Sequence, residues 1–131
     1  MNVRVVYVDT SALAALLKPE PESESLERWL DDNSATLVSS NLLETELRRV
    51  AVRDGLSQTD VTALLDGVAL AALDRAVFRN AGFLPMEMLR TLDALHLEAA
   101  IRLDADAMLT YDHRLALAAE AAGLTVIAPG R

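Results

Sequence analysis

The amino-acid sequence predicts an α/β domain in which helices cover both faces of a central parallel β-sheet. Short aliphatic and β-branched runs alternate along the chain with longer amphipathic segments, an alternation typical of parallel sheets. A length of 131 residues suffices for one hydrophobic core, so we expect a single domain over residues 1–131. Hydrophobic residues make up 52% of the chain but aromatic residues only 4%, which predicts a core of Leu, Val and Ala.

The N-terminal half opens with the run Val-Arg-Val-Val-Tyr-Val, whose β-branched residues predict a buried strand. An apolar helix follows, and Pro19 and Pro21 end it because proline disrupts a helix interior. Gly55 closes a later helix, and Ser57 is a residue type that caps the next one. In order, the predicted elements are a strand over residues 3–8, helices over 12–17 and 23–32, a strand over 35–39, and helices over 41–53 and 57–70.

The C-terminal half continues the alternation of strands and helices. Residues 71–76 are ambiguous and could form a short third strand. Gly123 ends the last helix, because glycine readily adopts the left-handed conformation found after helices. The remaining predicted elements are helices over residues 75–83 and 91–103, a strand over 107–111, a helix over 113–122 and a strand over 125–128.

Composition excludes several functional classes. The chain has no cysteine, so disulfide scaffolds and Cys-based zinc sites are ruled out, and with two histidines we do not expect a His-rich metal site. The chain contains no run of eighteen uncharged apolar residues, the length needed to span a membrane. Asp9 interrupts the apolar N-terminus, where a signal peptide needs an unbroken apolar run. We therefore expect a soluble cytoplasmic protein. The net charge of −8 argues against binding of nucleic acid by bulk basicity, but not against an enzyme that handles it through metal ions.

Two acidic residues follow predicted strands. Asp9 comes after the strand over residues 3–8, and Asp112 comes after the strand over 107–111. In open α/β sheets, ligands bind at the carboxyl ends of the strands, so both acids are candidate functional residues. Each also precedes a helix and has a purely structural interpretation as its N-cap.

Two further acids lie on helix faces that are otherwise apolar. Glu46 shares its face with leucine and valine residues, although it could simply pair with Arg49 at the edge of that face. Asp93 shares a stripe with His96, but it also falls in the first turn of its helix, where the helix dipole favours an anion. Glu44 receives a structural interpretation instead, because the spacing Asn-x-x-Glu from residue 41 resembles a capping box.

Together, Asp9, Glu46, Asp93 and Asp112 predict a group of carboxylates at one edge of the sheet. Carboxylates this close repel one another, and a divalent cation relieves the repulsion better than protonation does. An all-oxygen ligand set favours Mg²⁺ or Mn²⁺, which keep bound waters and engage phosphate. The reaction class that follows is metal-assisted hydrolysis of a phosphodiester.

Other polar residues have weaker claims to a functional role. Asp104 and Asp106 precede a strand and are expected at the opposite edge of the sheet, and structural roles are favoured for His96 and His113. The helix of Glu46 also carries three arginines that could meet RNA phosphates, or equally pair with neighbouring acids. These arginines are Arg48, Arg49 and Arg53.

Four sequence motifs resemble those of a known family. The segments are Tyr-Val-Asp-Thr-Ser-Ala-Leu over residues 7–13, Ser-Ser-x-Leu-Leu-x-x-Glu-Leu-x-Arg over 39–49, Thr-Leu-Asp-Ala-Leu-His-Leu over 91–97, and Leu-Thr-Tyr-Asp-x-x-Leu over 109–115. In this order and at these separations, they resemble PIN-domain ribonucleases, specifically the VapC-type toxins of bacterial toxin–antitoxin pairs. The resemblance covers nearly the whole chain, and no acidic position of the pattern is missing.

This resemblance implies a three-layer α/β/α PIN-like domain that cleaves RNA with Mg²⁺ or Mn²⁺. It makes Asp9 and Asp93 the principal metal ligands, completed by Glu46 and Asp112, with Thr110 as a hydroxyl that orients a carboxylate. A metal-bound water would attack phosphorus in line and leave a 3′-hydroxyl and a 5′-phosphate. The family further implies a homodimer and a cognate VapB-type antitoxin that blocks the site. Residues 41–53 and 57–70 would form much of the groove that the antitoxin covers.

Three alternative functions fit the sequence less well. A phospho-accepting receiver domain needs a lysine near the last strands, but Lys18 is the only lysine. A phosphatase with an aspartyl nucleophile needs a second acid two residues after the first, where this chain has Ser11. The remaining alternative is a catalytically silent PIN-like binding module, against which the complete set of acids argues.

Overall fold

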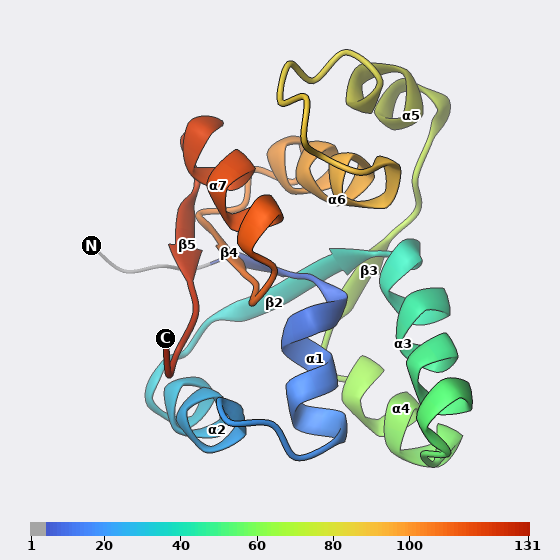
Figure 1. Cartoon of the computed structure of the whole chain (residues 1–131), viewed down its shortest axis with the longest axis vertical. Coiled ribbons are helices and arrows are strands. Elements are labelled where there is room, and N and C mark those ends of the chain that lie inside the picture. Colours follow the sequence, from blue (N-terminus) through green and yellow to red (C-terminus); the bar gives the residue numbers. More distant parts are fainter. Residues whose placement is uncertain (1–4) are drawn as a thin grey trace.

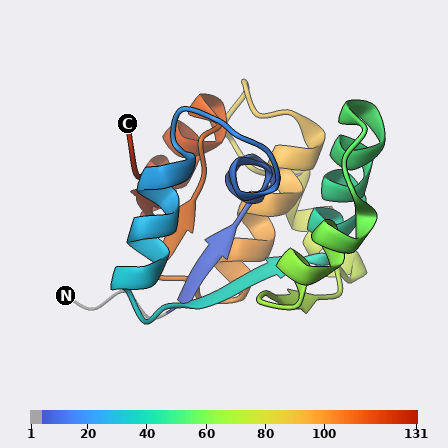
Figure 2. The same ribbon diagram turned by 90° about the horizontal axis from the view of Figure 1, so that it is seen from below.

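The computed structural model describes residues 5–131 and has three layers, with helices on both faces of a five-stranded sheet (Figures 1 and 2). Every neighbouring pair of strands is parallel, as the sequence predicts. The described part of the chain contains no helix with the length and apolarity needed to cross a membrane. The strands are β1 (Val5–Val8), β2 (Thr36–Ser40), β3 (Ala69–Ala71), β4 (Ala107–Leu109) and β5 (Thr125–Ile127).

Strand order in the sheet is β3-β2-β1-β4-β5, which places β1 at the centre. The chain winds outward from β1 in one direction through β2 and β3, and in the other through β4 and β5. The direction of winding therefore reverses between β1 and β4, where Val8 pairs with Leu109. In open α/β sheets, ligands bind outside the carboxyl ends of the strands at such a reversal point.

Helices divide between the two faces of the sheet. Helices α1 to α4 cover one face and α5 to α7 the other (Figure 1). Because side chains alternate along a strand, Val6 and Val8 of β1 join the first core and Tyr7 joins the second. The helices are α1 (Thr10–Leu17), α2 (Ser23–Asp32), α3 (Asn41–Asp54), α4 (Gln58–Leu65), α5 (Arg75–Ala81), α6 (Thr91–Arg102) and α7 (His113–Ala121).

Strand β3 and the helix before it differ from the sequence prediction. Helix α4 ends at Leu65 rather than at residue 70, and β3 occupies Ala69–Ala71 rather than residues 71–76. Asp66 and Gly67 form the turn that separates the two elements, and β3 pairs with Val38, Ser39 and Ser40 of β2. The other described element boundaries lie within two residues of the predicted ones, and predicted strand positions 3 and 4 lie outside the described residues.

Helix caps confirm the predicted cap roles of Asp9, Ser57 and Asp112 and contradict the predicted capping box. Asp9 caps α1 through its side chain, and Asp112 caps α7 in the same way. The predicted capping box of Asn41 and Glu44 is wrong, because Ser40 occupies the N-cap position of α3 and makes no side-chain cap. Glu44 instead forms an ion pair with Arg48 one turn later, so its carboxylate is turned along the helix surface.

Candidate active site

Asp9 follows β1 directly and is almost fully buried, with 5% of its surface exposed. Its Oδ1 accepts hydrogen bonds from Ser11 Oγ at 2.7 Å and from the Ala12 amide at 3.3 Å, and its Oδ2 accepts one from Thr110 Oγ1 at 2.9 Å. Burial raises the pKa of Asp9 to about 6, although the hydroxyls of Ser11 and Thr110 and the charge of His96 oppose this rise. Asp9 is therefore a desolvated carboxylate that is costly to leave charged without a counter-ion.

Thr110 links the two acids that follow β1 and β4. Its Oγ1 donates to Asp9 and accepts the backbone N–H of Asp112 at 3.0 Å. Asp112 in turn accepts the Leu115 amide at 2.9 Å, the N-cap bond of α7. The predicted juxtaposition of Asp9 and Asp112 at the carboxyl edge is thus present, and the N-cap roles coexist with it because each cap uses a single carboxylate oxygen.

Glu46 reaches this region from α3, but its partners differ from the predicted one. Oε1 of Glu46 lies 2.5 Å from Nε2 of His96 and accepts a hydrogen bond from Thr10 Oγ1 at 3.0 Å. Arg49, the predicted structural partner, does not form an ion pair with it within residues 5–131. Burial by itself would raise the pKa of Glu46, but the hydrogen bond and charge of His96, with Thr10, outweigh burial and lower it.

Asp93 lies in the first turn of α6, as predicted, and is half-buried. Arg90, rather than Thr91, occupies the N-cap position of this helix. Burial raises the pKa of Asp93, and the negative charges of Asp112 and Glu46 raise it further. The charges of Asp112 and Glu46, which come from two other helices or their caps, therefore both act on Asp93.

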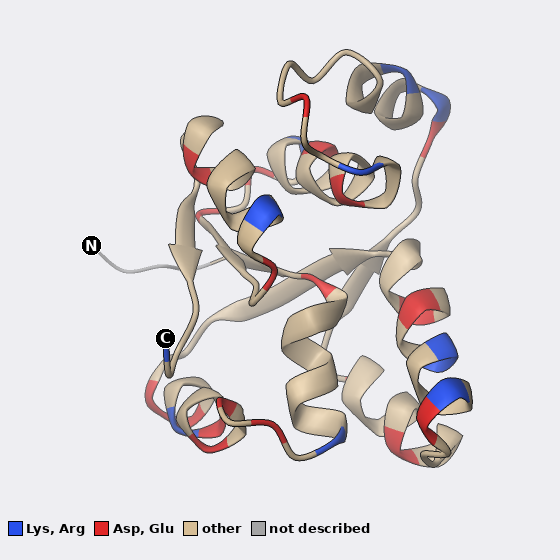
Figure 3. Ribbon diagram, in the orientation of Figure 1, with Lys and Arg blue, Asp and Glu red and all other residues tan. Residues whose placement is uncertain are grey.

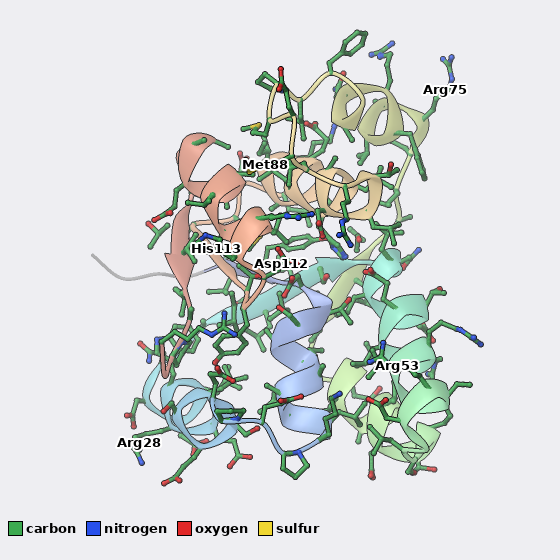
Figure 4. The ribbon with its side chains drawn as sticks, in the orientation of Figure 1. Arg28, Arg53, Arg75, Met88, Asp112 and His113 are labelled. Carbon is green, nitrogen blue, oxygen red and sulfur yellow. The ribbon has the colours of Figure 1, made fainter. Side chains whose placement is uncertain are left out.

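A single cleft of about 530 Å³ brings these three acids to a common surface. Glu46, Asp93 and Asp112 all line it, whereas Asp9 is buried between the ends of β1 and β4 and does not. In Figure 4, Asp112 lies where α7 begins, near the end of β1 and the start of α1. Within residues 5–131, no three Asp, Glu or His side chains form a compact ligand set, so the four carboxylates border a shared site instead of forming one tight cluster.

The arginines of α3 do not share one environment. Arg48 is held by Glu44, Gln58 and Thr62, which ties α3 to α4. Arg49 and Arg53, by contrast, line a second cleft of about 580 Å³ that also contains Glu46. Of the three arginines considered for contacts with RNA or a partner, two therefore border the candidate site.

His96 is buried, in agreement with the structural role predicted for it, and it also contacts a candidate site residue. This residue is 2% exposed, and it is held between the Tyr7 hydroxyl, 2.7 Å from Nδ1, and Glu46. Burial raises the pKa of Tyr7 to about 12, so Tyr7 presents a neutral hydroxyl at physiological pH. The sequence places His96 three residues after Asp93 on one helix face, but its contact with Glu46 depends on how α3 and α6 pack.

Asp106, as expected, lies at the opposite edge of the sheet and accepts a hydrogen bond from the Val5 amide.

A parallel α/β/α sandwich with acidic residues after two adjacent central strands and on two flanking helices is the architecture of a PIN domain. The family model described as "PIN domain" matches residues 6–121 of this chain. Ribonuclease VapC35 of Mycobacterium tuberculosis is 42% identical over 137 aligned positions, which cover 97% of this chain and 98% of the relative. The chain therefore belongs to the VapC ribonucleases of the PIN-domain family.

Solved structures show the same fold at lower sequence identity. VapC20 of Mycobacterium tuberculosis, described as a sarcin-ricin loop cleaving toxin, superposes with a TM-score of 0.76 at 17% identity and covers 95% of this chain and 99% of that one. A toxin–antitoxin complex from Klebsiella pneumoniae contains a chain that superposes with a TM-score of 0.69 at 17% identity, covering 95% and 97% of the two chains. These similarities confirm the predicted three-layer architecture.

Proposed function

We propose that this chain is a divalent-cation-dependent endoribonuclease that acts in the cytoplasm as the toxin of a toxin–antitoxin pair. The observation that carries the proposal is the cleft at the carboxyl edge of the sheet, where Glu46, Asp93 and Asp112 meet beside the buried Asp9. The VapC35 relative, named a ribonuclease, supports RNA as the substrate. The whole chain, residues 1–131, would act as one PIN domain.

The donor set fits Mg²⁺ or Mn²⁺. All four acidic side chains offer hard oxygen donors. Burial raises the pKa of Asp9 and of Asp93, and a bound cation would favour the charged form of both. In this proposal Asp9 and Asp93 are the principal ligands, and Glu46 and Asp112 complete the set. A bound cation would supply an acidified water and charge stabilisation at the phosphate.

The chain's own residues have separate tasks in this mechanism. Thr110 orients Asp9 through its 2.9 Å hydrogen bond, and the α7 cap holds Asp112 at the rim of the cleft. The RNA phosphate would lie in the cleft next to the carboxylates, and a water oxygen would attack phosphorus opposite the 3′-oxygen. The bond from phosphorus to the 3′-oxygen breaks, and that oxygen takes up a proton. The products carry a 3′-hydroxyl and a 5′-phosphate.

Partners of this chain are part of the proposal. A cognate VapB-type antitoxin would cover the cleft, and the net charge of −8 would favour a basic inhibitory segment. The described structural relative from a toxin–antitoxin complex supports such a partner. We also propose a homodimer, and contacts of Arg49 and Arg53 with RNA or antitoxin at the second cleft, whereas Arg48 is already engaged by α4.

Cleavage of total bacterial RNA tests the proposed function. The purified chain would be incubated with Mg²⁺, Mn²⁺ or EDTA beside an Asp9→Ala variant prepared identically, and the RNA ends would be mapped by sequencing. Discrete cuts that require the cation and are absent from the variant would support the nuclease and reveal its target. Equal cutting by both proteins would indicate a contaminant. The absence of cutting by either would leave two explanations, a narrow substrate missing from the RNA pool or a silent binding module.

A further inference from the structure

Arginines that form no ion pair or hydrogen bond within residues 5–131 border the candidate site on two sides, and the charge of one of them, Arg90, acts on Asp93. The structure describes ten arginines, and five of them form ion pairs: Arg28, Arg48, Arg53, Arg102 and Arg131. Within residues 5–131, the side chains of the other five make neither an ion pair nor a hydrogen bond: Arg49, Arg75, Arg79, Arg90 and Arg114. Unpaired arginines are notable in a chain where acids outnumber basic residues by 20 to 12.

Three of these five arginines line the two clefts that share Glu46 and Leu92. Arg90 and Arg114 line the first cleft, at the start of α6 and α7, and Arg49 lines the second, on α3. The two clefts adjoin at these two residues, and together they are called the groove: Arg90 and Arg114 lie in the first cleft with Asp93 and Asp112, and Arg49 lies in the second. Figure 3 shows basic segments where α6 and α7 begin and along α3, on both sides of this acidic region.

We propose that this groove binds the sugar–phosphate backbone of a single RNA strand, with Arg90 and Arg114 holding phosphates on one side of the cleaved bond and Arg49 on the other. This inference rests on the proposed function and adds the path of the substrate. RNA carries one negative charge per nucleotide, which suits arginines placed on both sides of a metal-binding centre. One guanidinium group can donate two parallel hydrogen bonds to the oxygens of one phosphate. An acidic peptide lacks this regular spacing of charge and is the less favoured ligand.

Binding of a fluorescein-labelled single-stranded RNA of mixed sequence tests the groove. The parent is the Asp93→Asn variant, which should not cut the probe, and affinity is measured against salt concentration in Mg²⁺. Arg49→Gln, Arg90→Gln and Arg114→Gln should each weaken binding several-fold and reduce the salt slope by about 0.7. Arg75→Gln and Arg79→Gln are matched controls, since they remove the same charge on α5, where Arg75 points away from the cleft (Figure 4).

Two results would overturn the groove. If the α5 controls weaken binding as much as the cleft variants do, only net charge matters. If the cleft variants bind RNA like their parent, the arginines do not hold it, and an acidic segment of a protein becomes their better ligand. Either result leaves the proposed function intact as long as the wild-type chain cuts RNA, so the two failures are distinguishable.

A different observation concerns how Glu46 is held. Oε1 of Glu46 takes both hydrogen bonds that the carboxylate makes within the described chain, from His96 and Thr10. His96 is itself fixed from behind, because Nδ1 lies 2.7 Å from the Tyr7 hydroxyl, which lies 3.0 Å from Oγ of Ser40. Tyr7, Ser40 and His96 are all buried, so this chain of contacts runs from the core to the rim of the cleft.

We infer that His96 is a positioning residue for Glu46. A carboxylate can only accept hydrogen bonds, so Nε2 of His96 donates to Oε1 and holds this oxygen back. Oε2 accepts no hydrogen bond within the described residues, so it is the oxygen available to a cation in the cleft that Glu46 lines. Groups that orient a metal ligand in this way contribute 10- to 100-fold in affinity or activity. This second inference also rests on the proposed function.

Three substitutions separate positioning from a merely structural role. His96→Gln retains a donor near the place of Nε2, His96→Asn has a donor too short to reach Glu46, and His96→Leu has none. We expect His96→Gln to keep most of kcat and of the Mn²⁺ affinity measured by calorimetry, whereas His96→Asn and His96→Leu lose about 10-fold or more in both with KM unchanged. Equal losses in all three variants, in proportion to their loss of thermal stability, would show that His96 only fills the core.

Discussion

Thr110 Oγ1 donates a 2.9 Å hydrogen bond to Oδ2 of Asp9, which joins the residues that follow the two central strands. The same oxygen receives the backbone N–H of Asp112, so one hydroxyl organises two of the acids. A hydrogen bond to the charged form of a carboxyl stabilises that form and lowers its pKa. Thr110 therefore helps to keep Asp9 ionised where burial opposes it.

Replacement of Thr110 by valine should move the pH dependence of cleavage. Valine has the same shape but donates no hydrogen bond, so the pKa of Asp9 should rise above its value of about 6. The acidic limb of the rate profile should shift to higher pH by about one to two units, since one hydrogen bond to a charged group contributes about 1.5–3 kcal/mol. Thr110→Ser keeps the hydroxyl and is the matched control; coincident profiles for the two variants would disprove the role of the hydroxyl.

Asp9→Asn should stabilise the metal-free protein at neutral pH. The folded state holds the Asp9 proton up to about pH 6, whereas an unfolded Asp releases it near 3.8. The contribution of Asp9 to the free energy of unfolding is fully present below pH 3.8 and is lost as the pH rises through 6. Because the folded and unfolded pKa values differ by about two units, this contribution is about 3 kcal/mol.

Urea unfolding in EDTA at pH 5 and pH 7.5 measures this effect. The wild-type chain should lose stability between the two values because of Asp9, and the Asn variant should lose less. The variant should also be inactive. An unfolding free energy that is lower for Asp9→Asn at pH 7.5 would mean that its hydrogen bonds outweigh the cost of the buried charge.

Divalent cations should stabilise the fold in a pH-dependent way. A ligand that binds only the folded state raises stability by mass action, and here Mn²⁺ must displace the proton of Asp9. The rise in Tm on adding Mn²⁺ should therefore be large at pH 7.5 and small at pH 5. Differential scanning fluorimetry of the wild-type chain and of Asp9→Asn gives the comparison, and equal shifts in both proteins would exclude Asp9 as a ligand.

Asp93→Asn should abolish cleavage without unfolding the chain. Asp93 is half-buried at the start of α6, and the negative charges of Asp112 and Glu46 repel it. The substitution removes this repulsion and also the favourable interaction with the helix dipole, so the free energy of unfolding should change by no more than about 1 kcal/mol. Activity should fall at least about 100-fold, as expected for a direct metal ligand. A fluorogenic RNA assay beside thermal unfolding tests both parts, and normal activity would refute the assignment.

Glu44→Gln and Glu46→Gln form a matched pair on one helix. Glu44 pairs with Arg48 near the surface, so its loss should cost less than about 1 kcal/mol and leave cleavage nearly unchanged. Glu46→Gln removes a carboxylate from the cleft and should reduce cleavage at least tenfold. Similar losses of activity in both variants would contradict the choice between them.

The fold was predictable to a large extent because its signals are local. Alternation of β-branched runs with amphipathic segments indicates a parallel sheet, and Asp9 and Asp112 are recognisable where strands end and helices begin. The errors arose where local signals compete: the pattern over residues 57–70 reads as one helix, but Asp66 and Gly67 turn the chain so that β3 can pair with β2. Asn41 and Glu44 match a capping box, yet Glu44 pairs with Arg48 instead.

By itself, the sequence determined the fold class, the family and which acids to examine, since these depend on patterns within short stretches of chain. The tertiary structure alone decided which groups meet. The packing of α6 against the sheet and α3 brings His96 to Glu46, fifty positions away in sequence, and the reversal point between β1 and β4 brings Thr110 to Asp9 across 101 positions. Contacts of this kind depend on the relative placement of whole elements, which no local pattern of residues encodes.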